Sequence, residues 1–166
     1  MPVMISYRIW SPYKAVPDIA ELSARQEAVT GVRCAFAVHQ EGPQGWVEMS
    51  AVPAASPATA CMLSRSTDPS VVLSSKRDLR PTRTELLHTL RQAKAVYYAG
   101  TAAGRTDFTR LLQLGLTWTL AHMTRGIIAG DAPGGQLEYW WSDAFLDRVE
   151  RLRKRVEAAG AAAETG

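Results

Sequence analysis

The stretch Gly100-Thr-Ala-Ala-Gly104-Arg105-Thr106 contains the residues that most resemble a chemical motif. It separates an apolar segment with strand character from a segment with helical periodicity. Glycines at such a turn let the backbone approach a phosphate, and the N-terminus of the following helix attracts anions. The spacing departs from a phosphate-binding loop, because three residues rather than four separate the glycines and arginine stands in the place of lysine. The departures favour a plain strand–helix turn capped by Thr106. The alternative is an anion site formed by Gly100, Gly104, Arg105 and Thr106.

The other potentially reactive side chains are scattered along the chain. His39, His88 and His122 stand singly, and none forms a metal-binding spacing with a second histidine or a cysteine. Cys34 and Cys61 lack the C-x-x-C pattern, which favours two thiols over a zinc site or a disulfide framework. Because catalysis requires several groups that converge, we predict no catalytic residues, no metal site and no cofactor.

Aromatic and basic side chains near the C-terminus offer a surface for a partner. In a strand, alternation places Trp140 on the face opposite Tyr139 and Trp141. If Trp141 packs against the last helix, Trp140 lies on the less buried face, and an exposed tryptophan is a frequent hot spot for protein binding. We therefore predict a partner-binding surface of Trp140 and Tyr139 with Arg148 and Arg151. A second packed face is the alternative for Trp140.

Charge and composition limit the classes of partner. The formal net charge is only +3, and acidic residues interleave with the basic stretches 76–83 and 148–155. Proteins that bind nucleic acid concentrate basic charge far more strongly, so a nucleic-acid partner is disfavoured. The first ten residues lack the regions of a signal peptide, and the most apolar helix is interrupted by polar residues. We therefore expect a cytoplasmic protein without a membrane span.

The elements that must position these residues follow from hydrophobic periodicity. Residues 108–123 form an apolar helix that should be buried on several sides. The remaining elements are predicted as strands at 3–9, 32–38, 46–52, 95–99, 127–128 and 137–141, and helices at 18–29, 82–93 and 142–158. Residues 53–80 are predicted as an irregular connection with weak signals for a short helix at 58–63 and a short strand at 70–74. Residues 159–166 are predicted as a frayed tail.

These elements predict one α+β domain over residues 1–158. A mainly antiparallel sheet should carry helices packed on one face, and split β-α-β (ferredoxin-like) units are a candidate arrangement. A chain of 166 residues can bury a core sufficient for such a domain without metal or disulfide bonds.

Four segments between residues 95 and 145 carry a resemblance to a known class. They read Ala95-Val-Tyr-Tyr, Thr119-Leu-Ala-His-Met-Thr, Gly126-Ile-Ile and Trp140-Trp-Ser-Asp-Ala-Phe. This half of the chain resembles small bacterial domains of the toxin-immunity type, which are found beside secreted toxins. The resemblance implies a cytoplasmic immunity protein that neutralises a toxin by direct binding, and it supplies no catalytic residues. The alternative function is a small ligand-binding or phosphate-handling enzyme that uses the 100–106 stretch.

Overall fold

A computed structural model of the chain describes residues 4–56, 59–77, 79–102, 106–131 and 137–165. The strands are β1 (Met4–Ser11), β2 (Cys34–Gly42), β3 (Gly45–Pro53), β4 (Cys61–Ser66), β5 (Ala95–Ala102), β6 (Ile127–Asp131) and β7 (Leu137–Trp140). The helices are α1 (Ile19–Thr30), α2 (Pro69–Lys76), α3 (Thr84–Arg91), α4 (Asp107–Thr124) and α5 (Ser142–Thr165).

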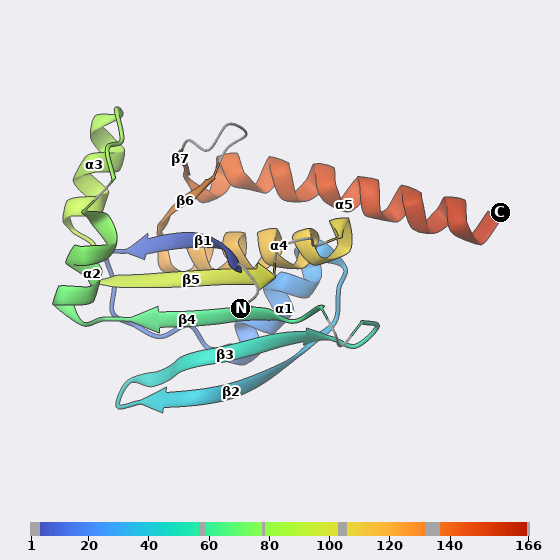
Figure 1. Cartoon of the computed structure of the whole chain (residues 1–166), viewed down its shortest axis with the longest axis horizontal. Coiled ribbons are helices and arrows are strands. Elements are labelled where there is room, and N and C mark those ends of the chain that lie inside the picture. Colours follow the sequence, from blue (N-terminus) through green and yellow to red (C-terminus); the bar gives the residue numbers. More distant parts are fainter. Residues whose placement is uncertain (1–3, 57–58, 78, 103–105, 132–136, 166) are drawn as a thin grey trace.

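The strands form a single antiparallel sheet in the order β2-β3-β4-β5-β1-β6-β7 (Figure 1). The N-terminal strand β1 lies near the middle, where it pairs with β5 on one side and with β6 on the other. Because β1 is antiparallel to both neighbours, β5 and β6 run in the same direction. The unit β5-α4-β6 is thus a split β-α-β arrangement with β1 inserted, and the predicted α+β fold class is confirmed.

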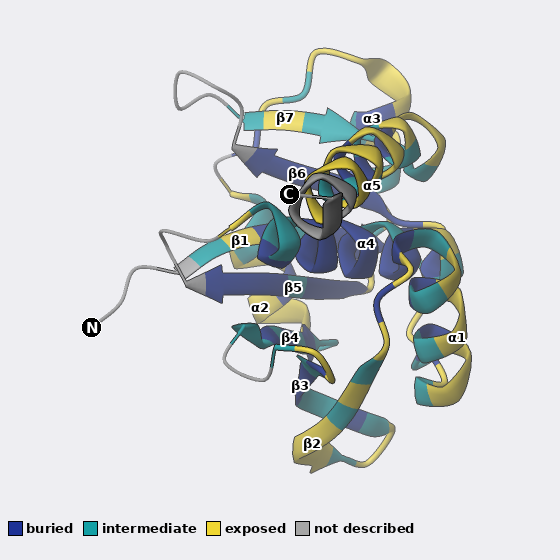
Figure 2. Ribbon diagram, turned by 90° about the vertical axis from the view of Figure 1, so that its right-hand side faces the viewer, coloured by how far each residue is buried: buried dark blue, intermediate teal, exposed yellow. Residues whose placement is uncertain are grey.

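Helix α4 is the centre of the main core, as its apolar periodicity predicts. Thr106 caps its N-terminus, because its side-chain oxygen accepts from the backbone N–H of Thr109. With α1 and α5 it covers one face of the sheet, and most of its residues are buried (Figure 2). From α5, Phe145, Val149 and Leu152 are buried in this core.

A second, smaller core lies where the strand residues point away from α4. Trp10, Val96 and Ile127 belong to this core, while their strand neighbours Ile9 and Tyr97 belong to the main one. Helices α2 and α3 pack over it at one end of the central strands (Figure 1). The sheet is therefore covered on its second face as well, over part of its length.

The irregular connection predicted for residues 53–80 is wrong. Strand β4 overlaps the second half of the segment 58–63 predicted as a short helix, and helix α2 contains the segment 70–74 predicted as a short strand. Asp68 accepts from the backbone N–H of Ser70 and Pro69 stands in the first turn, so the sequence Asp68-Pro69-Ser70 is a helix start. In β4 the period of two is hidden, because one of its buried positions is held by a charged residue, Arg65.

Three helix ends also differ from the prediction. Helix α3 begins at Thr84 rather than at residue 82, and its N-cap Arg83 makes no side-chain cap hydrogen bond. Helix α4 ends at Thr124, one residue beyond the predicted end, and the residue after it, Arg125, adopts the left-handed conformation with φ 53°. The predicted frayed tail from residue 159 is helical up to Thr165, since alanine favours helix.

Candidate functional site

The aromatic residues proposed for a partner surface are turned toward the protein. Trp140 is half-buried in the main core, where its ring packs at 6.3 Å from Tyr7 and 5.4 Å from Phe145, measured between centroids. Tyr139 lies on the opposite face, as alternation predicts, and packs against the second core. Its hydroxyl accepts from the backbone N–H of Arg80 at 3.2 Å. Neither ring protrudes from the surface.

The two arginines of that predicted surface differ from each other. The guanidinium of Arg148 lies over the ring of Trp140 at 4.7 Å, so these side chains are stacked on one another. Arg151 is exposed and forms an ion pair with Asp147, one helical turn earlier. The predicted surface thus reduces to charged side chains on α5, with the tryptophan beneath Arg148.

The glycine-rich stretch divides between strand and helix. Strand β5 continues to Ala102, and Gly100 is paired with Ser6 of β1 and with Met62 of β4. Gly100 is thus part of the sheet rather than of a loop, which separates it from the other residues of the alternative anion site. Thr106 is the cap of α4. Gly104 and Arg105 lie outside the described residues.

The three histidines lie on separate elements. His39 of β2 bonds the hydroxyl of Ser50 at 2.8 Å, His122 of α4 stacks on Trp118 with ring centroids 4.9 Å apart, and His88 is exposed on α3. Within the described part of the chain, no three His, Cys, Asp or Glu side chains are placed to hold a metal ion. Neither cysteine forms a disulfide there.

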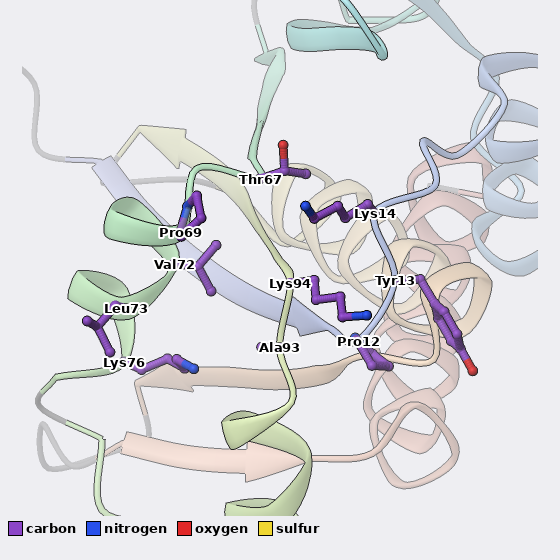
Figure 3. A pocket seen from close by; sticks show the side chains of 10 residues that line it. All are labelled: Pro12, Tyr13, Lys14, Thr67, Pro69, Val72, Leu73, Lys76, Ala93 and Lys94. Carbon is purple, nitrogen blue, oxygen red and sulfur yellow. The ribbon is translucent and has the colours of Figure 1, made fainter.

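A hollow lies in a part of the molecule that the sequence did not single out as a site. It is an open groove of about 680 Å³ between the loop after β1, the start and body of α2, and the loop before β5 (Figure 3). The described residues that line it are Pro12, Tyr13, Lys14, Thr67, Pro69, Val72, Leu73, Lys76, Ala93 and Lys94. We call it the lysine groove.

The lysine groove combines an apolar surface with positive charge. Val72 is buried at its base, whereas Leu73 and Tyr13 remain 64% and 49% exposed. Three lysines line it, and no acidic residue is among its described lining residues. The Nζ of Lys76 donates to the carbonyl of Leu90 at 2.8 Å, and partial burial lowers the pKa of this lysine. An apolar ligand with negative charge fits this combination.

Only one residue of the groove, Lys76, lay in a stretch that the sequence marked as a possible contact. The apolar pair Val71-Val72 followed by Leu73 could have indicated a partly unburied helix face, had residues 69–76 been recognised as a helix. Lys14 and Lys94 lie in loops 80 residues apart in the chain, and no local sequence pattern predicts that they line the same groove.

Comparison of the chain with protein-family models, with curated proteins and with solved structures gives no match. Among the described residues, no helix has both the length and the apolar character needed to cross a membrane.

Proposed function

We propose that this chain is a non-enzymatic protein-binding domain, and that its lysine groove holds an acidic, apolar segment of a partner protein. The observation that carries the proposal is the exposure of Leu73 within a hollow lined by three lysines. A leucine gains about 1.5–3 kcal/mol when it is buried. Its exposure in a groove is thus a source of binding free energy that folding has left unused.

The dimensions of the groove support a peptide segment as the ligand. Ligand pockets commonly span about 300–1,000 Å³, and 680 Å³ accommodates a few side chains. Leu73 and Tyr13 would contact the apolar side chains of the segment, while Lys14 and Lys94 would face its carboxylates. Such rim charges mainly speed association and select the partner.

The class of partner follows from the sequence. Because residues 95–145 resemble domains of the toxin-immunity type, we place a toxin first among the candidate partners. Neutralisation of the captured protein by this chain, measured as growth of cells that express both, is the corresponding assay.

Photo-crosslinking from inside the groove tests the proposal. With p-benzoylphenylalanine in place of Leu73, we expect one defined crosslinked product in cells of the native organism. Mass spectrometry of that product should place the crosslink beside Asp or Glu residues of the partner. The matched control carries the same group at Val38, an exposed apolar residue of the edge strand β2. Equal products from both positions, or none from position 73, would contradict the proposal.

A further inference from the structure

Arg65 is a charged residue at a core-facing position. In β4 the side chains of Cys61, Leu63 and Arg65 are buried, whereas the residues between them are partly exposed. Arg65 itself is only 5% exposed. Removing a cation from water costs free energy unless an opposite charge and hydrogen bonds replace its hydration. The burial of Arg65 therefore requires hydrogen bonds and an opposite charge to offset the loss of its hydration.

The protein compensates this cation only in part. Its Nε donates to the carbonyl of Trp46 at 3.0 Å, but Nη1 is buried without a hydrogen-bond partner. No carboxylate among the described residues forms an ion pair with it. Its cross-strand neighbour is Tyr97. Burial raises the pKa of that phenol to about 12, with Arg65 opposing the shift, so the ring stays neutral at physiological pH.

Arg65 is one of the residues that line a cavity of about 320 Å³. The cavity lies between the β2–β3 turn and the end of β4, and its lining residues are Gly42, Pro43, Gln44, Val47, Arg65, Ser66, Thr67 and Asp68. The amide of Gln44 and the hydroxyls of Ser66 and Thr67 are neutral groups that can donate hydrogen bonds. The carboxylate of Asp68 is held at the start of α2, where its Oδ1 accepts from the backbone N–H and the hydroxyl of Ser70 at 2.9 and 2.8 Å.

We propose that this cavity is an oxyanion site, in which Arg65 binds a carboxylate or phosphate group that enters from solvent. A guanidinium matches both groups with two parallel, charge-assisted hydrogen bonds. The anion would supply an opposite charge in contact with Arg65, because the Asp68 carboxylate that lines the same cavity accepts hydrogen bonds from Ser70 and no described carboxylate forms an ion pair with Arg65. Thr67 lines both this cavity and the lysine groove. The oxyanion site can nevertheless be tested without a partner protein, so its test is independent of the function proposed for the lysine groove.

Amide NMR spectra of the full chain, recorded during separate titrations with phosphate and with acetate at constant ionic strength, test the site. We expect saturable shifts at residues 42–47 and 65–68, with a dissociation constant in the millimolar range or below. Arg65→Met keeps an unbranched apolar stem, shorter than that of arginine, and removes the charge, and should weaken binding about tenfold or more. The control Lys154→Met removes one positive charge from the exposed face of α5 and should leave the titration unchanged.

Each outcome of these titrations bears on the proposal. Binding of phosphate alone assigns the site to a free phosphate-type anion, and binding of acetate alone assigns it to a carboxylate such as that of a peptide. Shifts confined to residues 12–14 and 93–94, no saturable shift with either anion, or identical binding by Arg65→Met would overturn the proposal. The residues whose amide signals shift are identified on the unaltered chain, so these titrations test the oxyanion site even if Arg65→Met fails to fold.

Discussion

At the scale of single residues, the environment of Cys34 makes its thiol less reactive. Burial and the nearby Glu27 carboxylate raise the pKa of this thiol from its ordinary 9.0 to about 11. Only the thiolate attacks alkylating reagents. This shift lowers the thiolate fraction near neutral pH about 100-fold, and the greater nucleophilicity of a more basic thiolate restores about eightfold of the rate.

We predict that Cys34 reacts with iodoacetamide at pH 8 about tenfold more slowly than a cysteine in a short peptide. Peptide mass spectrometry can follow Cys34 separately from Cys61. Glu27→Gln removes the negative charge that raises the pKa and should speed the reaction, whereas Glu157→Gln on α5 should not. Alkylation of Cys34 at the rate of the free peptide would contradict the described environment.

The residue scale also shows where sequence reasoning ends. The period of two predicts that Trp140 and Tyr139 lie on opposite faces of the sheet, and the structure confirms it. The contact between Trp140 and Arg148 was not predictable from the sequence. The two residues are eight positions apart, one on a strand and one on a helix, so their contact depends on how these two elements pack. The burial of Arg65 was not predictable either, because a charged residue in a short strand is expected to be exposed unless its surroundings are known.

At the scale of elements, helices α1 and α4 are joined at a close contact. Gly115 of α4 faces Thr30 of α1, and a Cβ added at position 115 would overlap the Thr30 methyl group. The same threonine accepts from the Gln26 amide at 2.7 Å and donates to the Gln26 carbonyl at 2.9 Å, so it cannot turn away freely. The glycine therefore sets the distance between the two helices.

We predict that Gly115→Ala lowers the free energy of unfolding by about 1–3 kcal/mol, because overpacking outweighs the higher helix propensity of alanine. Adding Thr30→Ser removes the methyl group but keeps the hydroxyl, and should recover most of the loss. Gly160→Ala on α5, where the added Cβ meets nothing within 4 Å, is the control and should not destabilise. Urea unfolding measures all three. A neutral Gly115→Ala variant would show that the helices are farther apart than described.

Elements with long periodic patterns were predictable from the sequence, and those with short or masked patterns were not. Helix α4, the β2–β3 hairpin and the apolar stripe of α5 follow from spacing alone. For β4 and α2 the sequence predicts the wrong type of element. Strand β4 has a charged residue at a core position, and helix α2 is only eight residues long and contains β-branched valines, which favour strands. The wrong prediction for α2 also hid the lysine groove, of which this helix forms one wall.

At the scale of the whole molecule, the sheet brings three distant parts of the chain to one groove. The loop after β1, helix α2 and the loop before β5 meet because β1 and β5 pair along their full length, which places Ser11 opposite Ala95. The groove thus depends on the central pair of strands, and a partner bound there would contact segments from both halves of the chain. Its affinity should fall as salt rises, since exposed charges are screened.

The most direct test of the account is a comparison of two charge-reversed variants in binding a peptide selected from a random display library. We expect selected peptides to combine Asp or Glu with large apolar residues. The groove variant combines Lys14→Glu and Lys94→Glu and reverses two of the three lysine charges of the groove. The α5 variant combines Arg151→Glu and Lys154→Glu and changes the net charge of the chain by the same amount.

For such a peptide we predict that the groove variant binds about tenfold or more weakly, because two favourable charge contacts become unfavourable. The α5 variant should retain the dissociation constant of the unaltered chain to within about twofold. Loss of binding in the α5 variant with full binding in the groove variant would contradict the account, and would place the partner surface on the charged face of α5.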